Sequence, residues 1–299
     1  MPRAGRRPVD AAESVFDAAP LALVAVDTGR GVHVSPQAFA WAAGRLWLLA
    51  PSDSLKVRVV RRSGVAGVTV PSGDGRAVMV TGRARVLEAW PPSLDLASAP
   101  AVALLGAGAL AYGKRNAAVA AGVALDALSG RMGLPGARSV LSVEPTRWAL
   151  FDGDEVVDHD GWLAAEPIAS RRRRRSPVSL SALPRALRTV VSKAAEATVG
   201  WPGPAGPVAL VAVPEDLTFG RVRVPAAVAD LLGPPEGEGC VMVHASPGNR
   251  PGEYRGVLLR GPIDAGARRA GGLVVTVRPT RLTWWEGYRS ATAPRSDGR

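Results

Sequence analysis

A serine and a lysine two positions apart, Ser54 and Lys56, are the residues whose types and spacing most clearly suggest chemistry. They stand at the start of a short predicted helix that ends at Arg62. A hydroxyl and an ammonium group beside the free N–H groups of a helix N-terminus can bind an anion, because the donors and the helix dipole both favour negative charge there. Arg58 and Arg61 could add positive charge. The alternative is a helix-capping serine followed by solvated basic residues.

The segments around this helix predict an antiparallel β-sheet. Val-rich apolar runs are separated by glycine-containing turns at 28–31 and 72–75, a pattern typical of strands joined by hairpins. We expect strands at 21–26, 32–41, 45–49, 65–70, 76–87, 139–143 and 147–151. Residues 99–130 are rich in Ala and Leu and predict a helical insert with a break near Gly113, because glycine weakens a helix interior.

The second half of the chain returns to strands after a linker. Residues 181–198 predict a helix, and residues 201–207 predict a rigid loop rich in Pro and Gly. Further strands are expected at 208–213, 220–224, 240–245, 255–260 and 273–277. The five consecutive arginines at 171–175 lie in the linker, and we interpret them as a solvated tether. No aromatic residues are interleaved with them, which argues against binding of single-stranded nucleic acid.

Two sequence matches indicate an internal duplication. Residues 143–148, Val-Glu-Pro-Thr-Arg-Trp, match residues 277–282, Val-Arg-Pro-Thr-Arg-Leu. Residues 20–26, Pro-Leu-Ala-Leu-Val-Ala-Val, match residues 207–213, Pro-Val-Ala-Leu-Val-Ala-Val. The second unit is shorter than the first because it lacks the helical insert.

Five runs in the first half carry a resemblance to a known family. They are residues 32–39, 44–51, 54–58, 65–70 and 76–84. In this order they resemble the FMN-binding split barrel of the pyridoxamine 5'-phosphate oxidase-like superfamily, clearly over residues 20–90 and weakly over residues 207–265. The resemblance implies that the Ser-x-Lys element grips a flavin phosphate and that the first run lies along the isoalloxazine ring.

The resemblance also implies a set of cofactor-binding positions. They are Val34, Ser35, Leu49, Ala50, Ser54, Lys56, Arg58 and Ala77. The family often has Thr, Arg and Gln where Ala50, Leu55 and Ala77 stand, so three polar contacts to the cofactor are lost. FMN, the deazaflavin coenzyme, haem or no cofactor at all therefore stay open, with His33 interpreted as an edge residue rather than a haem ligand. The second unit has Val-Pro-Ala-Ala at 224–227 in place of the Ser-x-Lys element, so we expect its barrel to be structural.

Length and composition fit two globular domains. The 299 residues are 47% hydrophobic and 21% charged, with a formal net charge of +11. Nearly all the positive charge is arginine, which we interpret as coding bias in a GC-rich genome rather than a nucleic-acid surface. The single cysteine, Cys240, excludes an intramolecular disulfide and a cysteine-based metal site, and the histidines lack metal-ligand spacing. No apolar stretch is long enough to span a bilayer, so we expect a soluble, cytoplasmic protein.

These observations predict a mainly β protein with helical insertions (α+β), built from two antiparallel split β-barrels in tandem. We expect a first barrel at 1–165, an Arg-rich linker and helix at 166–200, and a degenerate second barrel at 201–299. The predicted function is binding of a flavin-type cofactor, FMN or deazaflavin, by an oxidoreductase that uses a small-molecule redox substrate or electron donor. The alternative is a non-enzymatic binding or interaction protein with an empty or repurposed pocket.

We also predict that the two barrels pair within one chain as an intramolecular pseudo-dimer. The resemblance implies this arrangement, because single split barrels of the family usually work as homodimers with the cofactor at the interface. Large aromatic residues dominate interface cores, so Trp201, Trp284 and Trp285 are candidates for the buried wall. The alternative for these tryptophans is the core of the second barrel itself.

Overall fold

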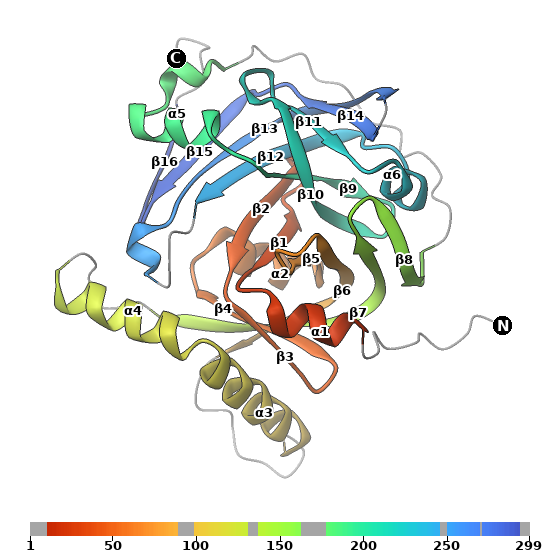
Figure 1. Ribbon diagram of the computed structural model, residues 1–299. Helices are drawn as coiled ribbons and strands as arrows, with labels where there is room; N and C mark the ends of the chain where they lie inside the picture. The colour runs from red at the N-terminus through yellow and green to blue at the C-terminus, as the bar shows by residue number, and fades with distance from the viewer. Residues whose placement is uncertain are drawn as a thin grey trace.

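The computed structural model describes residues 11–88, 99–130, 137–162, 178–245, 250–269 and 271–293 and contains two β-barrels packed together (Figure 1). The strands of the first barrel are β1 (Ala22–Asp27), β2 (Val32–Gln37), β3 (Phe39–Ala42), β4 (Arg45–Pro51), β5 (Val65–Pro71), β6 (Arg76–Glu88), β7 (Arg138–Asp152) and β8 (Glu155–Asp160). Its helices are α1 (Ala11–Ala18), α2 (Leu55–Ser63), α3 (Ala99–Arg115) and α4 (Ala117–Leu128).

The second barrel follows the same plan without the helical insert. Its strands are β9 (Ala197–Gly203), β10 (Gly206–Asp216), β11 (Arg221–Val224), β12 (Gly237–Ala245), β13 (Arg255–Arg269), β14 (Gly272–Val277), β15 (Arg281–Glu286) and β16 (Arg289–Thr292). Its helices are α5 (Arg185–Ser192) and α6 (Ala226–Leu232). The predicted fold class, two antiparallel split barrels in tandem with helical insertions, is confirmed.

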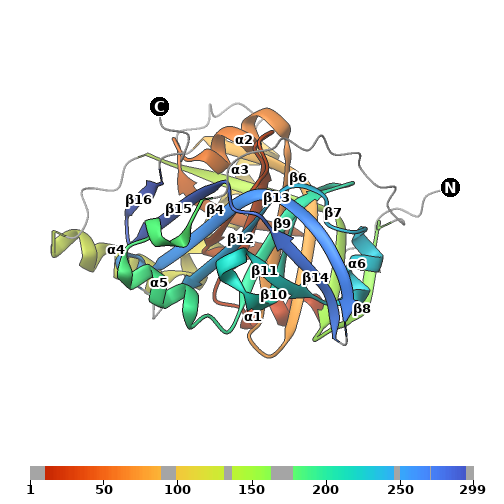
Figure 2. The ribbon, with the colours of Figure 1, turned by 90° about the horizontal axis from the view of Figure 1, so that it is seen from above.

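Both sheets are antiparallel throughout and strongly curved. The first has the order β2-β1-β5-β6-β7-β4-β3, and β8 adds to β7. Because only Ala38 separates β2 from β3, the two ends of this order belong to one bent strand, and the sheet curls into a split barrel. The second has the order β12-β9-β10-β11-β14-β13-β15-β16, and the pairing of β12 with β13 closes six strands into a barrel. Long β13 curves across this barrel when the molecule is seen from above (Figure 2).

Each strand of the first barrel has a counterpart in the second. The pairing of β1 with β5 recurs as β9 with β12, and the pairing of β4 with β7 recurs as β11 with β14. Helix α2 follows β4 as α6 follows β11. This shared order fits the predicted tandem duplication.

One of the two sequence matches holds in three dimensions. The threonine of each Pro-Thr-Arg motif donates its hydroxyl hydrogen to the carbonyl oxygen of the neighbouring strand, at 3.1 Å from Thr146 to Thr81 and at 3.3 Å from Thr280 to Arg260. The other match is wrong, because it equates β1 with β10 whereas the pairing makes β9 the counterpart of β1. Runs of Ala and Val are common to buried strands, so they do not distinguish one strand from the next.

The strand boundaries differ from the prediction around Pro145. The separate strands predicted at 139–143 and 147–151 form one strand, β7. Pro145 lies at an irregularity in the β6–β7 ladder, opposite Gly82. An added Cβ on Gly82 would lie 2.0 Å from the Glu144 oxygen, so glycine lets the two backbones approach and the strand continue through the bulge.

The start of the second barrel also differs. The helix predicted at 181–198 is confined to α5, and β9 begins before the expected boundary at 201. The loop predicted at 201–207 is a hairpin between β9 and β10, in which Pro202 and Pro207 lie opposite each other. Proline has no N–H to donate, so two prolines can lie opposite each other only at a non-hydrogen-bonded pair of an antiparallel ladder. The arginines at 171–175 lie outside the described residues.

A cluster of buried side chains, here called the interbarrel cluster, lies between the two barrels. Its members are Leu23, Ala25, Val32, Val34, Ala209, Cys240, Met242 and Leu258. The backbones approach closely at Gly67 of β5, where an added Cβ would lie 1.9 Å from the Pro207 oxygen. The Thr69 hydroxyl donates to the carbonyl oxygen of Ala209 across the same boundary. Strands β5 and β10 therefore pack backbone to backbone.

The three tryptophans predicted for the buried wall have different surroundings. Trp285 packs against the interbarrel cluster, whereas Trp201 lies in the core of the second barrel and Trp284 packs against that core. The single cysteine, Cys240, is fully buried in the interbarrel cluster, and burial raises the pKa of its thiol to about 12. The thiol is therefore protonated and enclosed at neutral pH.

The helical insert is tied to both barrels. Asn116, between α3 and α4, donates from Nδ2 to the Phe39 oxygen at 2.9 Å. Asp126, at the end of α4, is fully buried and accepts hydrogen bonds from the Gly252 N–H at 3.0 Å and the Tyr288 hydroxyl at 3.2 Å. Within the described residues, no helix combines the length and the apolar character that crossing a lipid bilayer requires.

Candidate functional site

Helix α2 begins as the sequence predicts, with Ser54 at the N-cap position. The Ser54 hydroxyl does not cap the helix, and its oxygen is buried without a hydrogen-bond partner. Lys56 is largely buried, and its Nζ donates to Gln37 Oε1 at 2.5 Å, while Gln37 Nε2 donates to the Leu49 oxygen at 2.7 Å. Burial, and to a smaller extent the charge of Arg138, lowers the pKa of Lys56 to about 8. No described carboxylate forms an ion pair with this lysine.

Strand β2 carries three polar side chains on one face, His33, Ser35 and Gln37, because alternate residues of a strand point the same way. The opposite face carries Val32 and Val34, which belong to the interbarrel cluster. His33 Nδ1 and Ser35 Oγ are buried without hydrogen-bond partners. Strand β2 pairs with β1 along one edge and with no described strand along the other, so this polar row lies at the open side of the split barrel.

A cavity of about 370 Å³, here called the first cavity, lies at the Gln37 end of the polar row. Gln37 and Leu49 line it from the first barrel, Tyr112 from α3, and Tyr254 and Tyr288 from the second barrel. All three tyrosines of the chain therefore meet in one place. Burial is the first cause that raises the pKa of Tyr112 and Tyr288 to about 12, so both phenols stay protonated at neutral pH. The volume lies within the range of roughly 300–1,000 Å³ that is usual for small-molecule sites.

Four of the predicted cofactor-binding residues lie around the first cavity and the polar row. Leu49 lines the cavity, and Lys56 contacts Gln37 in its wall. Ser35 and Ser54 contribute buried, unpartnered hydroxyls. Three of the four polar members of the predicted set, Ser35, Ser54 and Lys56, thus have side chains with polar atoms withdrawn from solvent on β2 and at the start of α2.

The other four predicted residues lie elsewhere. Val34 belongs to the interbarrel cluster, Ala50 is enclosed in the core of the first barrel, and Arg58 is exposed on α2. Ala77 lines a second cavity of about 310 Å³. The predicted set therefore combines residues that the fold separates.

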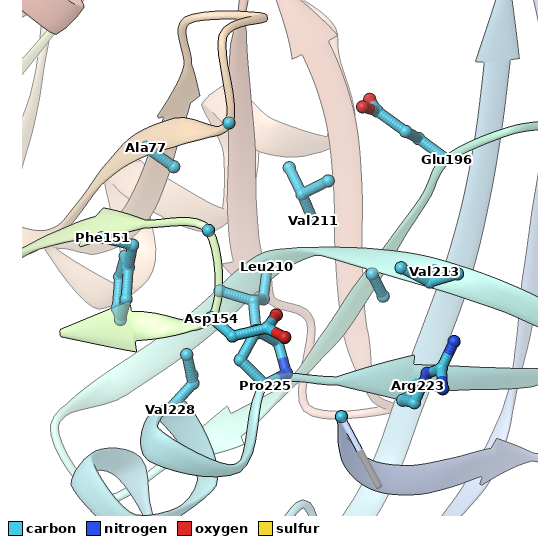
Figure 3. A pocket seen from close by; sticks show the side chains of 14 residues that line it. Ala77, Phe151, Asp154, Glu196, Leu210, Val211, Val213, Arg223, Pro225 and Val228 are labelled. Carbon is cyan, nitrogen blue, oxygen red and sulfur yellow. The ribbon is translucent and has the colours of Figure 1, made fainter.

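The second cavity also lies between the two barrels (Figure 3). Ala77 and Phe151 line it from the first barrel, and Pro225 and Val228 line it from the second. Pro225 precedes α6 as Ser54 precedes α2, but it offers neither a hydroxyl nor an N–H. Both cavities draw their lining from both barrels, and in the second cavity Ala77 lies with the start of helix α6.

The sequence analysis did not predict several residues that line the first cavity. Gln37 could have been predicted, because it follows Ser35 by two positions and alternate residues of a strand lie on the same face. Arg138 and the three tyrosines come from distant segments, and no local pattern links them. Within the described part of the chain, no group of three or more His, Cys, Asp or Glu residues could hold a metal ion.

No protein-family model matches this sequence, and no curated protein matches it. Similar solved structures include the conserved hypothetical protein Rv2991 of Mycobacterium tuberculosis, at 16% identity and a TM-score of 0.34, covering 51% of this chain and 89% of the other. A protein assigned as a pyridoxamine 5'-phosphate oxidase from Listeria innocua is 13% identical, with a TM-score of 0.31 and coverage of 48% and 98%. An F420 reductase is 17% identical, with a TM-score of 0.30 and coverage of 46% and 94%. These similarities are remote, and the strand pairings of the chain itself define the two-barrel fold.

Proposed function

We propose that the chain binds a phosphate-bearing flavin-type cofactor, FMN or the deazaflavin coenzyme, in the first cavity and that it is an oxidoreductase. The observation that carries the proposal is a largely buried ammonium group, Lys56, which contacts Gln37 of the cavity wall, together with the unpartnered hydroxyls of Ser35 on the strand of Gln37 and Ser54 at the start of the helix of Lys56. Buried polar groups without partners and buried charges without counter-ions are costly, and phosphate oxygens would satisfy both. The resemblance of residues 20–90 to FMN-binding split barrels supports the same cofactor class.

The residues present fit such a group. Lys56 and Ser54 would hold the phosphate, and Leu49 with the three tyrosines offers flat, largely apolar walls for a ring system. Gln37 is held between Lys56 and the Leu49 oxygen, so its orientation is fixed before a ligand binds. When bound, a flavin would supply the hydride or electron transfer, while the chain orients it and the helical insert excludes water. Ala50 offers no polar contact, so we expect weaker binding than in a site that keeps a threonine there.

We also propose that one chain forms the complete site as an intramolecular pseudo-dimer. The first cavity supports this proposal because it draws its lining from both barrels. We expect a monomer in sedimentation experiments and one cofactor per chain from absorbance. Two cofactors per chain, or a first barrel that dimerises and binds as well alone as in the full chain, would contradict the proposal.

A non-enzymatic binding role is the second candidate. None of the described residues that line the first cavity is a carboxylate or a histidine, and the pKa values of its three tyrosines are raised, so its side chains offer no general base at neutral pH. None is a cysteine or a methionine either, which leaves a haem iron only the tyrosine phenols as axial ligands. Absorbance of the purified protein separates a flavin, a deazaflavin and a haem from an uncoloured ligand.

The direct test compares FMN with riboflavin, which lacks the phosphate, by titration calorimetry. Replacing the buried lysine in Lys56→Met should weaken FMN binding about tenfold to a hundredfold, because a hydrogen bond to a charged group contributes roughly 1.5–3 kcal/mol. Riboflavin binding should change little. The matched control is Lys193→Met, which removes an exposed lysine. The proposal fails if neither FMN nor the deazaflavin coenzyme binds the unaltered chain, or if the Lys56 variant binds FMN as tightly as the control.

A further inference from the structure

Strands β13 and β15 place two arginines, Arg260 and Arg281, directly opposite each other. They lie on the face of the second barrel that meets the first, because Arg260 also stands opposite Cys240 of the interbarrel cluster. Like charges directly opposite in an antiparallel pair are destabilising. The equivalent pair in the first barrel is Thr81 and Arg147, so the fold itself does not require two cations here.

Neither arginine of this pair has a carboxylate partner among the described residues. Arg260 donates from Nη2 to Thr283 Oγ1 at 3.0 Å, and its Nε is buried without a partner. In contrast, Arg278, three positions before Arg281, forms an ion pair with Asp264 at 2.6 Å. Adjacent, unneutralised cations with a buried, unused donor indicate a place where an anion is expected.

His33 of the first barrel lies close to the arginine pair, because its neighbour Val34 packs at Gly200, Gly200 pairs with Cys240, and Cys240 stands opposite Arg260. Its Nδ1 is buried without a partner. Burial, followed by the positive charges of Arg260, Lys56 and Arg281, lowers the pKa of His33 to about 3. The imidazole is therefore neutral at physiological pH and keeps one ring nitrogen free to donate a hydrogen bond. Ser35, the next residue on the same face of β2, adds an unpartnered hydroxyl.

We propose that His33, Arg260 and Arg281 form an oxyanion-binding subsite at the open edge of β2, built by both barrels, which holds a phosphate or carboxylate group. Guanidinium groups suit this role because their N–H donors match two oxygens of such a group at once. The identity of the ligand rests on the proposed function: the oxyanion belongs either to the cofactor phosphate or to an acidic second reactant. The equivalent Arg147 instead donates its Nε to the Gly161 oxygen at 2.8 Å, so the chain has one such subsite among its described residues.

The experiment measures the thermal stability of the full chain against inorganic phosphate, with sodium chloride added to hold the ionic strength constant. Phosphate should raise the melting temperature of the unaltered protein beyond the effect of chloride. Arg260→Thr introduces the residue that the first barrel has at the equivalent position, so the strand tolerates it. Arg260→Thr and Arg281→Gln should each weaken the apparent phosphate affinity roughly tenfold or more. Arg278→Gln, whose arginine is already paired with a carboxylate, should keep the phosphate response.

Titration of the Arg260→Thr variant with FMN and riboflavin identifies the source of the oxyanion. Weaker binding of FMN but not of riboflavin assigns the subsite to the cofactor phosphate, and unchanged FMN binding with a lost phosphate response assigns it to the second reactant. The subsite is overturned if both variants keep the phosphate response or if the unaltered chain shows none. If both variants lose the response but no flavin binds, the subsite stands and the proposed function fails.

Discussion

Substituting Gly67 with alanine should force the two barrels apart. The new Cβ would lie 1.9 Å from the Pro207 oxygen, and real Cβ contacts stay above 3.0 Å, so the backbones of β5 and β10 must separate by about 1 Å. Overpacking of this kind costs roughly 1–3 kcal/mol, and loss of the hydrogen bond from Thr69 to Ala209 adds about 1 kcal/mol. We therefore expect the free energy of unfolding to fall by about 2–4 kcal/mol, which corresponds to a melting temperature roughly 3–6 °C lower for a chain of this length.

The single cysteine provides a second readout of the same substitution. Cys240 is fully buried between the barrels, so a thiol reagent should modify it slowly in the native protein and faster in Gly67→Ala. The control is Gly106→Ala on α3, where an added Cβ meets nothing within 4 Å and alanine favours the helix. The control should keep or slightly raise the melting temperature and leave Cys240 protected. If Gly67→Ala melts with the unaltered protein and leaves the thiol equally protected, the barrels do not pack through β5 and β10.

Two further predictions concern the helical insert and the response to acid. Asp126→Asn should weaken the attachment of α4 by roughly 2–4 kcal/mol, because the buried side chain loses its charge-assisted hydrogen bonds. Limited proteolysis should then cut this variant within the helical insert. The exposed control, Asp154→Asn, should resist cleavage there as the unaltered protein does. The unfolded chain protonates His33 near its usual pKa of 6.5, whereas the folded chain does so only near 3, so the stability that His33 contributes above pH 6.5 is lost as the pH falls toward 3. Between pH 7 and pH 4.5 this loss of unfolding free energy is about 2–3 kcal/mol. Urea unfolding at the two pH values should show a smaller loss in His33→Gln and an unchanged loss in the exposed control His159→Gln. Equal losses in the two variants would refute the assignment of this pH dependence to His33.

Local conformation could be predicted from the sequence because it depends on neighbouring residues. The hairpin turn between β3 and β4 lies between the strands expected at 32–41 and 45–49, and it uses positive φ angles of 52° at Ala43 and 70° at Gly44. The N-cap of α2 was expected at Ser54, where a small polar side chain and an extended backbone start a helix. The alternation of apolar residues predicted most strands correctly, since a half-buried strand must present every second side chain to the core.

Strand partners and the composition of the site were decided only by the tertiary structure. Alternating apolar residues show that a segment is a buried strand but not which strand it joins, so residues 20–26 were matched to the wrong strand of the second barrel. For the same reason the predicted set grouped Ala77 with Lys56, although Ala77 lines the second cavity and Lys56 contacts Gln37 in the wall of the first. Contacts between segments more than 200 residues apart, such as those that bring Gln37 and Tyr254 to one cavity, leave no trace in the local sequence. These long-range contacts arise because each barrel has its own core and still exposes an apolar strand face. Burial of the two faces against each other fixes which polar residues meet at the edge of the interface between the barrels.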